Sequence, residues 1–314
     1  MPSPLKKSLN ASHPIRTQAF NLFFMKVTGI SFIRNAITYD YPIVEAITSI
    51  LPICDRFIVA VGQSDDATAE LIQSLASDKI TILPTVWDDT LRKGGKVLAV
   101  ETNKALDAVD NNTDWIFYIQ GDEIFHEDGL QMVRKEMKKY LHKKKVLGLV
   151  VNYLHFYGSY DYVGDSRSWY RREVRIIRND KRIRSYRDAQ GFRLEGKPLP
   201  SKLIPVYMHH YGWVKPPEIQ QAKQETFNKL WHDDNWVRTN IPDVDEFDYG
   251  EIDSLKRFEG THPKVMQPRI EAMNWHFAFD PTRRKMSFRK RVLHAVERMT
   301  GVRLGEFKNY KLVR

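Results

Sequence analysis

The stretch DWIFYIQGDE, residues 114–123, decides how this chain is expected to fold. Its apolar run is typical of a buried strand, and the polar cluster Gln120 to Glu123 follows that run directly. Adjacent acids at the end of a buried strand are costly unless a cation meets them, and a hard divalent ion such as Mg²⁺ or Mn²⁺ is the usual partner. The other interpretation is that Asp122 and Glu123 cap a helix that follows.

Strand-like and helix-like patterns alternate around this stretch. Strands are expected at 27–33, 56–62, 79–86 and 115–120, with helices at 42–51, 67–75 and 97–109 between them. The alternation predicts an α/β fold with a twisted, mostly parallel sheet flanked by helices. Because right-handed crossovers bring the carboxyl ends of parallel strands to one edge, a ligand is expected there. The residues at that edge are Arg34, Asn35, Gln63 to Asp66, Trp87 to Asp89 and Gln120 to Glu123.

The pattern changes after a helix expected at 129–141. Longer β-like runs at 146–156, 173–179 and 202–210 predict antiparallel additions to the sheet, and amphipathic helices are expected at 217–231 and 288–299. These patterns predict three regions along the chain. They are a flexible lead-in over 1–25, a core over 26–215 and a helical C-terminal extension over 216–314 packed on that core.

Composition narrows the class of protein. The chain has one cysteine, Cys54, so it has no intramolecular disulfide and no thiolate cluster for structural zinc. No run approaches the roughly 20 apolar residues that a membrane-spanning helix needs. We therefore expect a cytoplasmic protein, soluble or peripheral at the inner face of the membrane.

The net charge of +10 is concentrated in two segments. Residues 167–187 contribute +7 and residues 283–314 contribute +9, so the rest of the chain sums to −6. Such segments suit nucleic acid, a diphosphate or anionic lipid. The helix expected at 288–299 is basic and amphipathic, so it either lies on anionic lipid or packs on its own domain.

Three strand ends, in this order along the chain, resemble those of the family 2 glycosyltransferases. The segments are SFIRN (31–35), Ser64 to Thr68, and WIFYIQGDE (115–123), and the resemblance covers roughly residues 27–215. The family has the GT-A fold. The resemblance implies an inverting transfer of a sugar from a nucleotide-diphosphate sugar to a hydroxyl of a glycan or lipid-linked acceptor, with a divalent metal, in cell envelope polysaccharide synthesis.

The chain departs from the family pattern at two places. The usual Asp-X-Asp motif is Gln120-Gly121-Asp122 here, and Val61-Gly62 stands where an acid is expected before the second turn. The resemblance places the metal at Asp122 and Glu123, with His210 as a third ligand. His209 and His210 are adjacent at a strand end, so their side chains point to opposite faces and one of them can face the site.

The donor and the acceptor need further residues. An inverting transfer needs a carboxylate base, for which Asp188 is the first candidate by the resemblance and Asp165 the second. Each of these acids could instead form an ion pair with a neighbouring arginine. An aromatic run from Tyr153 to Tyr170 suits sugar rings on the acceptor side, or it is core packing. The residues expected at the donor are Arg34, Asn35, Ser64, Asp66, Arg92, Lys96 and Gln120.

Two other functions are compatible with parts of the sequence. A metal-dependent nucleotidyltransferase uses a similar sheet, but a glycine-rich loop is expected after its first strand, and residues 31–41 contain none. A basic nucleic-acid-binding protein would explain the charge, but no recognisable binding motif is present. We therefore expect a nucleotide sugar and an acceptor as partners, and no nucleic acid.

Overall fold

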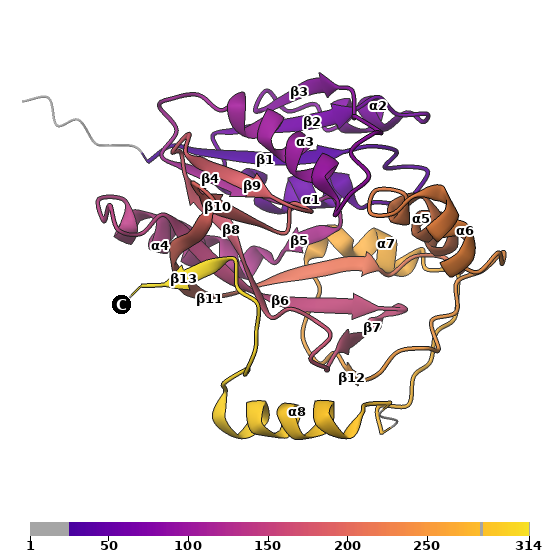
Figure 1. Cartoon of the computed structure of the whole chain (residues 1–314). Helices are drawn as coiled ribbons and strands as arrows, with labels where there is room; N and C mark the ends of the chain where they lie inside the picture. Colours follow the sequence, from indigo (N-terminus) through magenta and orange to yellow (C-terminus); the bar gives the residue numbers. More distant parts are fainter. Residues whose placement is uncertain (1–24, 283–284, 314) are drawn as a thin grey trace, which may run out of the picture.

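The computed structural model describes residues 25–282 and 285–313 (Figure 1). Its first half alternates strands and helices, as the sequence predicts. The elements are β1 (Val27–Ile33), α1 (Ile43–Ile50), η1 (Leu51–Ile53), β2 (Arg56–Gly62), α2 (Thr68–Gln73), β3 (Ile80–Thr85), α3 (Lys96–Asp107), β4 (Trp115–Tyr118), β5 (Glu123–Phe125), η2 (Glu127–Gly129) and α4 (Leu130–Tyr140).

The second half of the chain is richer in strands. Its elements are β6 (Gly148–Tyr157), β7 (Ser159–Gly164), β8 (Arg172–Arg178), β9 (Ile183–Tyr186), β10 (Gly191–Leu194), β11 (Lys197–Trp213), α5 (Pro217–Asn228), α6 (Asp234–Asn240), β12 (Leu255–Arg257), η3 (Lys264–Met266), α7 (Gln267–Glu271), α8 (Phe288–Thr300) and β13 (Tyr310–Leu312).

Thirteen strands of the described residues form one sheet. Its main path runs β3-β2-β1-β4-β8-β6-β11, and the pairs among β1 to β4 are parallel. Strand β8 is antiparallel to both β4 and β6, whereas β6 and β11 are parallel. This twisted sheet, with parallel strands flanked by helices and with antiparallel additions, confirms the predicted α/β fold class.

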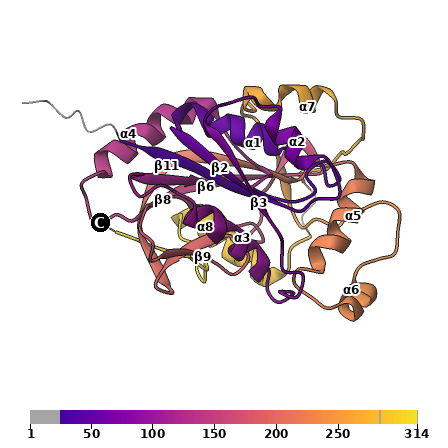
Figure 2. The same ribbon diagram turned by 90° about the horizontal axis from the view of Figure 1, so that it is seen from above.

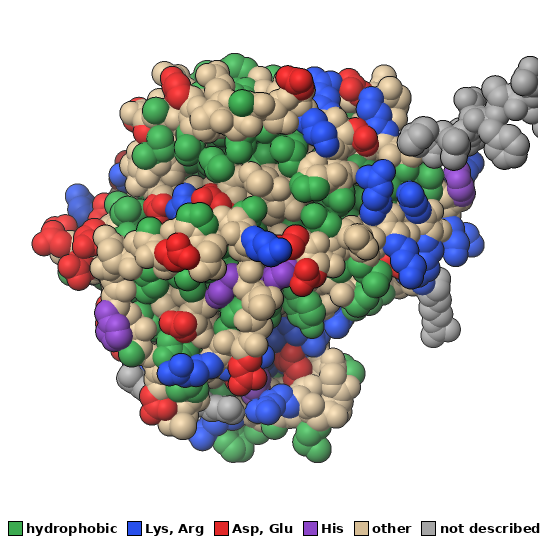
Figure 3. Space-filling view, turned by 180° about the vertical axis from the view of Figure 1, so that it is seen from behind, with side chains coloured by type: hydrophobic (Ala, Val, Ile, Leu, Met, Phe, Trp, Pro, Cys, Tyr) green, Lys and Arg blue, Asp and Glu red, His purple; other side chains and the backbone are tan. Residues whose placement is uncertain are grey.

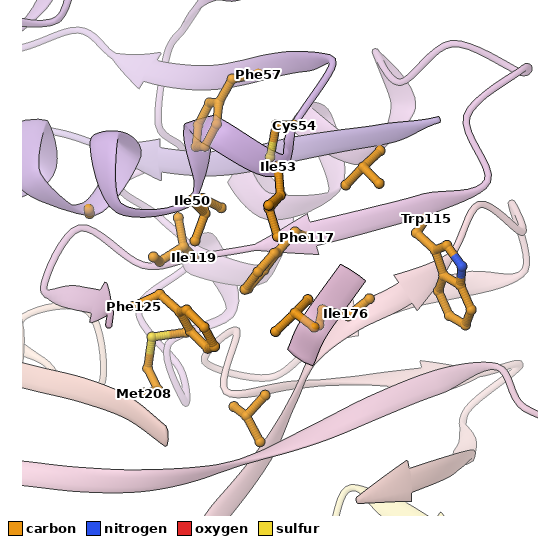
Figure 4. Close-up of a cluster of buried hydrophobic side chains, with 14 of the residues drawn as sticks. Ile50, Ile53, Cys54, Phe57, Trp115, Phe117, Ile119, Phe125, Ile176 and Met208 are labelled. Atoms are coloured by element: carbon orange, nitrogen blue, oxygen red, sulfur yellow. The ribbon is translucent and has the colours of Figure 1, made fainter. Parts of the chain in front are cut away.

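Helices cover both faces of the sheet (Figure 2). On one face α1 and α4 pack over a cluster that includes Phe57, Trp115, Phe117 and Met208 (Figure 4). On the other face α3 packs over a second cluster of buried residues from β1, β2, β4 and β8. The two apolar faces hold the strands in register, so the strand ends at the carboxyl edge are fixed relative to one another.

Several elements differ from the prediction. Residue Glu123 begins the short strand β5, which pairs antiparallel with β11, so it does not cap a helix. Beyond residue 216 the chain forms helices and also two short strands, because β12 pairs with β7 and β13 pairs with β11. Of the predicted lead-in, only Met25 lies within the described residues, and its side chain is buried. None of the helices in the described residues is both long enough and apolar enough to cross a membrane.

Candidate active site

A cavity of about 700 Å³ opens at the carboxyl edge of the parallel strands. Residues of α5 and of the segment that follows it form the wall of the cavity that the strand ends do not supply. Seven of the predicted site residues line it, namely Arg34, Asn35, Arg92, Gln120, Asp122, Asp188 and His210. Five do not, namely Ser64, Asp66, Lys96, Glu123 and Asp165.

The ends of β1 and β2 are joined by side-chain hydrogen bonds. Asn35 has a left-handed backbone (φ 54°), and its carboxamide donates to Asp65 at 3.2 Å and accepts from the Asp65 amide at 2.9 Å. The Asn35 amide donates to the Ser64 hydroxyl at 3.0 Å, so Ser64 supports the site from outside the cavity. Asp66 turns away and accepts from the Thr38 amide and hydroxyl, at 2.8 and 2.9 Å. The acid that faces the cavity is therefore Asp65.

The end of β3 brings an aromatic ring to the same wall. The Arg34 guanidinium lies 5.8 Å from the centre of the Trp87 ring and 3.0 Å from the Asp89 carboxylate. Gly62 makes room for this ring, because a Cβ atom there would lie 2.4 Å from the Trp87 Nε1 atom. Trp87, Asp65 and Asp89 all line this part of the cavity, which therefore combines an aromatic ring with two carboxylates.

Asp122 is the acid that the motif brings into the cavity. Its carboxylate lies 3.7 Å from the His210 Nε2 atom and 3.6 Å from the Lys223 ammonium. Burial alone would raise the pKa of Asp122, but His210, Lys223 and Lys215 together lower it below its usual value. Asp122 is therefore ionised in the folded protein.

A chain of hydrogen bonds fixes the tautomer of His210. The His155 Nε2 atom contacts the Tyr170 carbonyl oxygen at 2.8 Å, and a carbonyl only accepts, so His155 carries its proton on Nε2. Burial lowers the pKa of His155 well below its usual value, so that ring is neutral, and burial also lowers the pKa of His210, against the charges of Asp122 and Glu123, which raise it. The His155 Nδ1 atom must then accept from the His210 Nδ1–H at 3.2 Å. The His210 Nε2 atom faces Asp122, and it carries a lone pair in the neutral form of the ring.

These residues fit a divalent cation as part of its ligand set. In the neutral form of His210 its Nε2 lone pair faces a carboxylate oxygen of Asp122, and two acceptors so placed need a cation or a proton donor between them. Gly212 keeps this space open, since a Cβ there would lie 2.6 Å from the Asp122 Oδ2 atom. The described residues contain no group of three His, Cys, Asp or Glu side chains arranged for a metal. The remaining ligands would have to come from water or from the substrate.

Glu123, which the sequence assigned to the metal, has another partner. Its carboxylate accepts from Arg175 at 2.6 and 2.9 Å, from the Tyr153 hydroxyl at 2.6 Å and from the Gln120 amide at 3.0 Å. Neither charged side chain is exposed. Arg175 also donates to the Gln190 carbonyl oxygen at 2.7 Å. The buried Glu123–Arg175 ion pair thus connects the acidic motif to the loop that carries Asp188.

Asp188 lies on this loop and lines the cavity. Its neighbours Arg187 and Ala189 both have left-handed backbones, with φ of 53° and 60°. Such conformations are costly for residues with a Cβ and are often kept at functional sites. Burial raises the pKa of Asp188. A carboxylate of raised basicity at the cavity wall has the properties of a general base.

The loop between β3 and α3 is held by residues from the C-terminal part of the chain. Arg92 donates to the Asp234 carboxylate at 2.7 Å and to the Lys229 carbonyl oxygen at 2.8 Å. The Gly95 amide donates to the Leu230 carbonyl oxygen at 3.2 Å, so this amide is already engaged. Gly95 is therefore part of the contact between this loop and the residues after α5.

Several arginines of the basic segment 167–187 form ion pairs within the molecule. Arg167 forms an ion pair with Glu297 at 2.9 Å, and Arg171 forms one with Glu306 at 3.0 Å. Arg184 likewise pairs with Asp107. Asp165 lies beside this segment and away from the cavity, where its amide donates to the Ser254 carbonyl oxygen.

Sequence reasoning missed several residues of the cavity. Lys223 gave no local signal because it lies in an ordinary amphipathic helix, and His155, which contacts His210 behind the cavity wall, was one member of the aromatic run. Most of that run is core, since Phe156, Tyr157 and their neighbours are buried, whereas Tyr170 lines the cavity. Of the adjacent histidines, His210 faces the cavity and His209 stacks on Phe156.

The sequence matches no protein-family model and no curated protein. Among solved structures, it is similar to residues 1–349 of TarS from S. aureus, at 12% identity over 64% of each chain with a TM-score of 0.37. A glucosyl-3-phosphoglycerate synthase from Mycobacterium tuberculosis, solved with Mn²⁺, UDP and phosphoglyceric acid, has 18% identity over 42% of this chain and 43% of that one, with a TM-score of 0.28. A 4-diphosphocytidyl-2C-methyl-D-erythritol synthase from Anaerococcus prevotii has 10% identity over 60% of this chain and 89% of that one, with a TM-score of 0.34. This chain thus spans less than two thirds of the TarS fragment, and at these identities the similarity concerns the arrangement of the sheet and its helices alone.

Proposed function

We propose that this protein is a glycosyltransferase that uses a nucleotide-diphosphate sugar. The observation that carries the proposal is the cavity at the carboxyl edge of the sheet. One wall of this cavity, at Trp87, is suited to bind a nucleoside. The cavity also holds the ionised Asp122 beside cationic groups, and Asp188, a carboxylate whose pKa is raised. A cavity of about 700 Å³ is of the size that such a ligand needs.

The donor would lie along the strand ends. Trp87 would stack on the base, and Asp65 or Asp89 would accept from base or ribose donors. Arg34 is the cation of this wall, and Gln120 presents an amide beside Asp122. These assignments place the diphosphate next to Asp122, where positive groups gather.

Asp188 would act as the base of an inverting transfer. It would accept the proton of the acceptor hydroxyl while that oxygen attacks the anomeric carbon from the face opposite the diphosphate. Arg175 fixes the loop that carries Asp188 through the Gln190 carbonyl, and the same arginine fixes the motif through Glu123. The buried Arg175 side chain would thus fix the position of Asp188 relative to the donor site.

A divalent cation, Mn²⁺ or Mg²⁺, belongs to this proposal as a predicted cofactor. Asp122 and His210 would hold it, with diphosphate oxygens and water as its other ligands. When bound, such an ion supplies positive charge to the leaving diphosphate. Glu123 would not be a ligand, since Arg175 occupies both of its oxygens.

The acceptor would be a glycan or a lipid-linked molecule of the cell envelope, reached from the cytoplasmic face of the membrane. Helix α8 supports this setting, because its apolar stripe faces outward. The side chains of Phe288, Val292 and Met299 are 76%, 46% and 86% exposed, whereas Glu297 points inward to Arg167. Hydrophobic and basic side chains lie next to one another at the lower end of Figure 3, where Figure 1 places α8. A basic helix with an exposed apolar stripe suits an anionic lipid surface.

The test is a thermal-shift panel of UDP, GDP, CDP and dTDP, each with and without Mn²⁺. We expect one diphosphate to raise the melting temperature, more so with Mn²⁺, and Asp122→Ala to remove the effect. Asp78→Ala, which changes an exposed acid outside the cavity, is the matched control. Asp188→Asn should keep the ligand-induced rise in melting temperature. The same substitution should slow the release of diphosphate from the matching nucleotide sugar by about 10²-fold to 10⁴-fold. Shifts with nucleoside triphosphates alone would point to nucleotidyl transfer, and no shift at all would overturn the proposal.

A further inference from the structure

Lys223 of α5 holds a positive charge against the carboxylate of Asp122. Its ammonium lies 3.6 Å from the Asp122 Oδ2 atom, donates to the Gly212 carbonyl oxygen at 2.9 Å and lies 4.8 Å from the centre of the Tyr41 ring. Only 12% of its side chain is exposed. The ammonium therefore has a defined position, on the opposite carboxylate oxygen from His210.

A second lysine strengthens the positive field. The Lys215 ammonium is buried, donates to the Asp40 carbonyl oxygen at 2.5 Å and lies 4.6 Å from the centre of the same Tyr41 ring. The charges of both lysines act on Asp122 and lower the pKa of its carboxyl group. A divalent ion on Asp122 would be repelled by the ammonium of Lys223 while that group stays in place.

The ammonium can leave Asp122 only if another anion receives it. Lys223 lines the cavity, and the diphosphate of a nucleotide sugar would bring such an anion next to it. Lys215 has no such freedom, since it is fully buried beneath Tyr41. The lysine that moves is therefore Lys223.

We propose that Lys223 couples the binding of the divalent ion to the binding of the diphosphate. Without ligands Lys223 occupies Asp122 and weakens the binding of an ion there. When a diphosphate enters, Lys223 pairs with a phosphate oxygen and leaves the carboxylate to the ion. This inference rests on the proposed donor, and by linkage it requires each ligand to raise the affinity of the other by the same factor.

The test measures Mn²⁺ affinity from the paramagnetic resonance of free Mn²⁺, using the full chain. Without nucleotide, Lys223→Met should bind Mn²⁺ about tenfold more tightly than the wild type. Lys223→Arg keeps the charge and should stay close to the wild type. The control Lys135→Met removes an exposed lysine of α4, and so makes the same change in net charge at a distance from the cavity.

A second arm repeats the titration with the diphosphate that binds best among UDP, GDP, CDP and dTDP. The diphosphate should raise the Mn²⁺ affinity of the wild type, and should do so less in Lys223→Met. Unchanged Mn²⁺ affinity in Lys223→Met without nucleotide would overturn the coupling role, even if the wild type binds the diphosphate. Absence of any diphosphate binding in the wild type would overturn the proposed donor instead, so the two failures are distinct.

Discussion

At the scale of single residues, the two acids of the motif have opposite roles. Asp122 faces the cavity, and Glu123 begins β5 and points to Arg175 inside the protein. Alternation along an extended chain explains why neighbours diverge. The sequence shows that two acids are adjacent, but it does not show which one meets an arginine 52 residues later. That is why the metal was predicted on both.

Arg175→Met is expected to destabilise the protein strongly. The substitution leaves Glu123 charged and buried without its partner, which costs about 3 to 5 kcal/mol in the free energy of unfolding. Adding Glu123→Gln should recover much of that loss, because the second change removes the stranded charge. Urea unfolding curves of both variants measure this difference. The control is Arg182→Met, whose exposed pair with Asp180 should contribute less than about 1 kcal/mol, and similar losses for the two arginines would contradict the argument.

At the scale of elements, local patterns predicted the first half of the fold well. Each of the four expected strands there has its counterpart in β1 to β4, because buried apolar runs and helical spacing are both local signals. The short strands β5, β12 and β13 could not be predicted in this way. Each has three residues and exists only because a distant strand offers its free edge. For the same reason the cavity residues that follow strand ends, such as Asp122, could be predicted from the sequence, whereas those on α5, such as Lys223, could not.

Helix α8 provides the prediction at this scale. Phe288→Asp combined with Met299→Asp should weaken the binding of the protein to vesicles containing anionic phosphatidylglycerol, because both exposed apolar side chains would be lost from the stripe. Sedimentation with vesicles at low and high salt measures the effect. Val86 is 69% exposed and follows β3, which lies at the opposite end of the molecule from α8 (Figure 1), so Val86→Asp is the control. Equal binding of all three proteins would exclude α8 as the contact.

At the scale of the whole molecule, the C-terminal segment with Asn309 and β13 packs beside the loop that carries Asp188. Strand β13 pairs with β11, and just before it the Asn309 carboxamide donates to Glu173 at 3.5 Å and accepts from Arg193 at 3.3 Å. Glu173 is buried on β8 next to this contact. Burial raises the pKa of Glu173 to about 8, and the charge of Asp188 acts in the same direction. The C-terminal segment therefore closes over a carboxyl group that folding keeps protonated near neutral pH.

This carboxyl group should make the stability of the fold fall as the pH rises. The ordinary pKa of glutamate is 4.5, so between pH 4.5 and about 8 the folded protein keeps a proton on Glu173 that the unfolded chain has released. The free energy of unfolding then decreases with pH, by up to about 1.4 kcal/mol per pH unit from this group. Glu173→Gln keeps the shape and removes the titration, so its stability should decline less between pH 5 and pH 8 and exceed that of the wild type at pH 8. Denaturant unfolding at several pH values measures both curves, with the exposed Glu195→Gln as control. Parallel curves for wild type and Glu173→Gln would show that Glu173 is ionised in the folded protein. The contact between Asn309 and Glu173 would then not depend on a proton on the Glu173 carboxyl group.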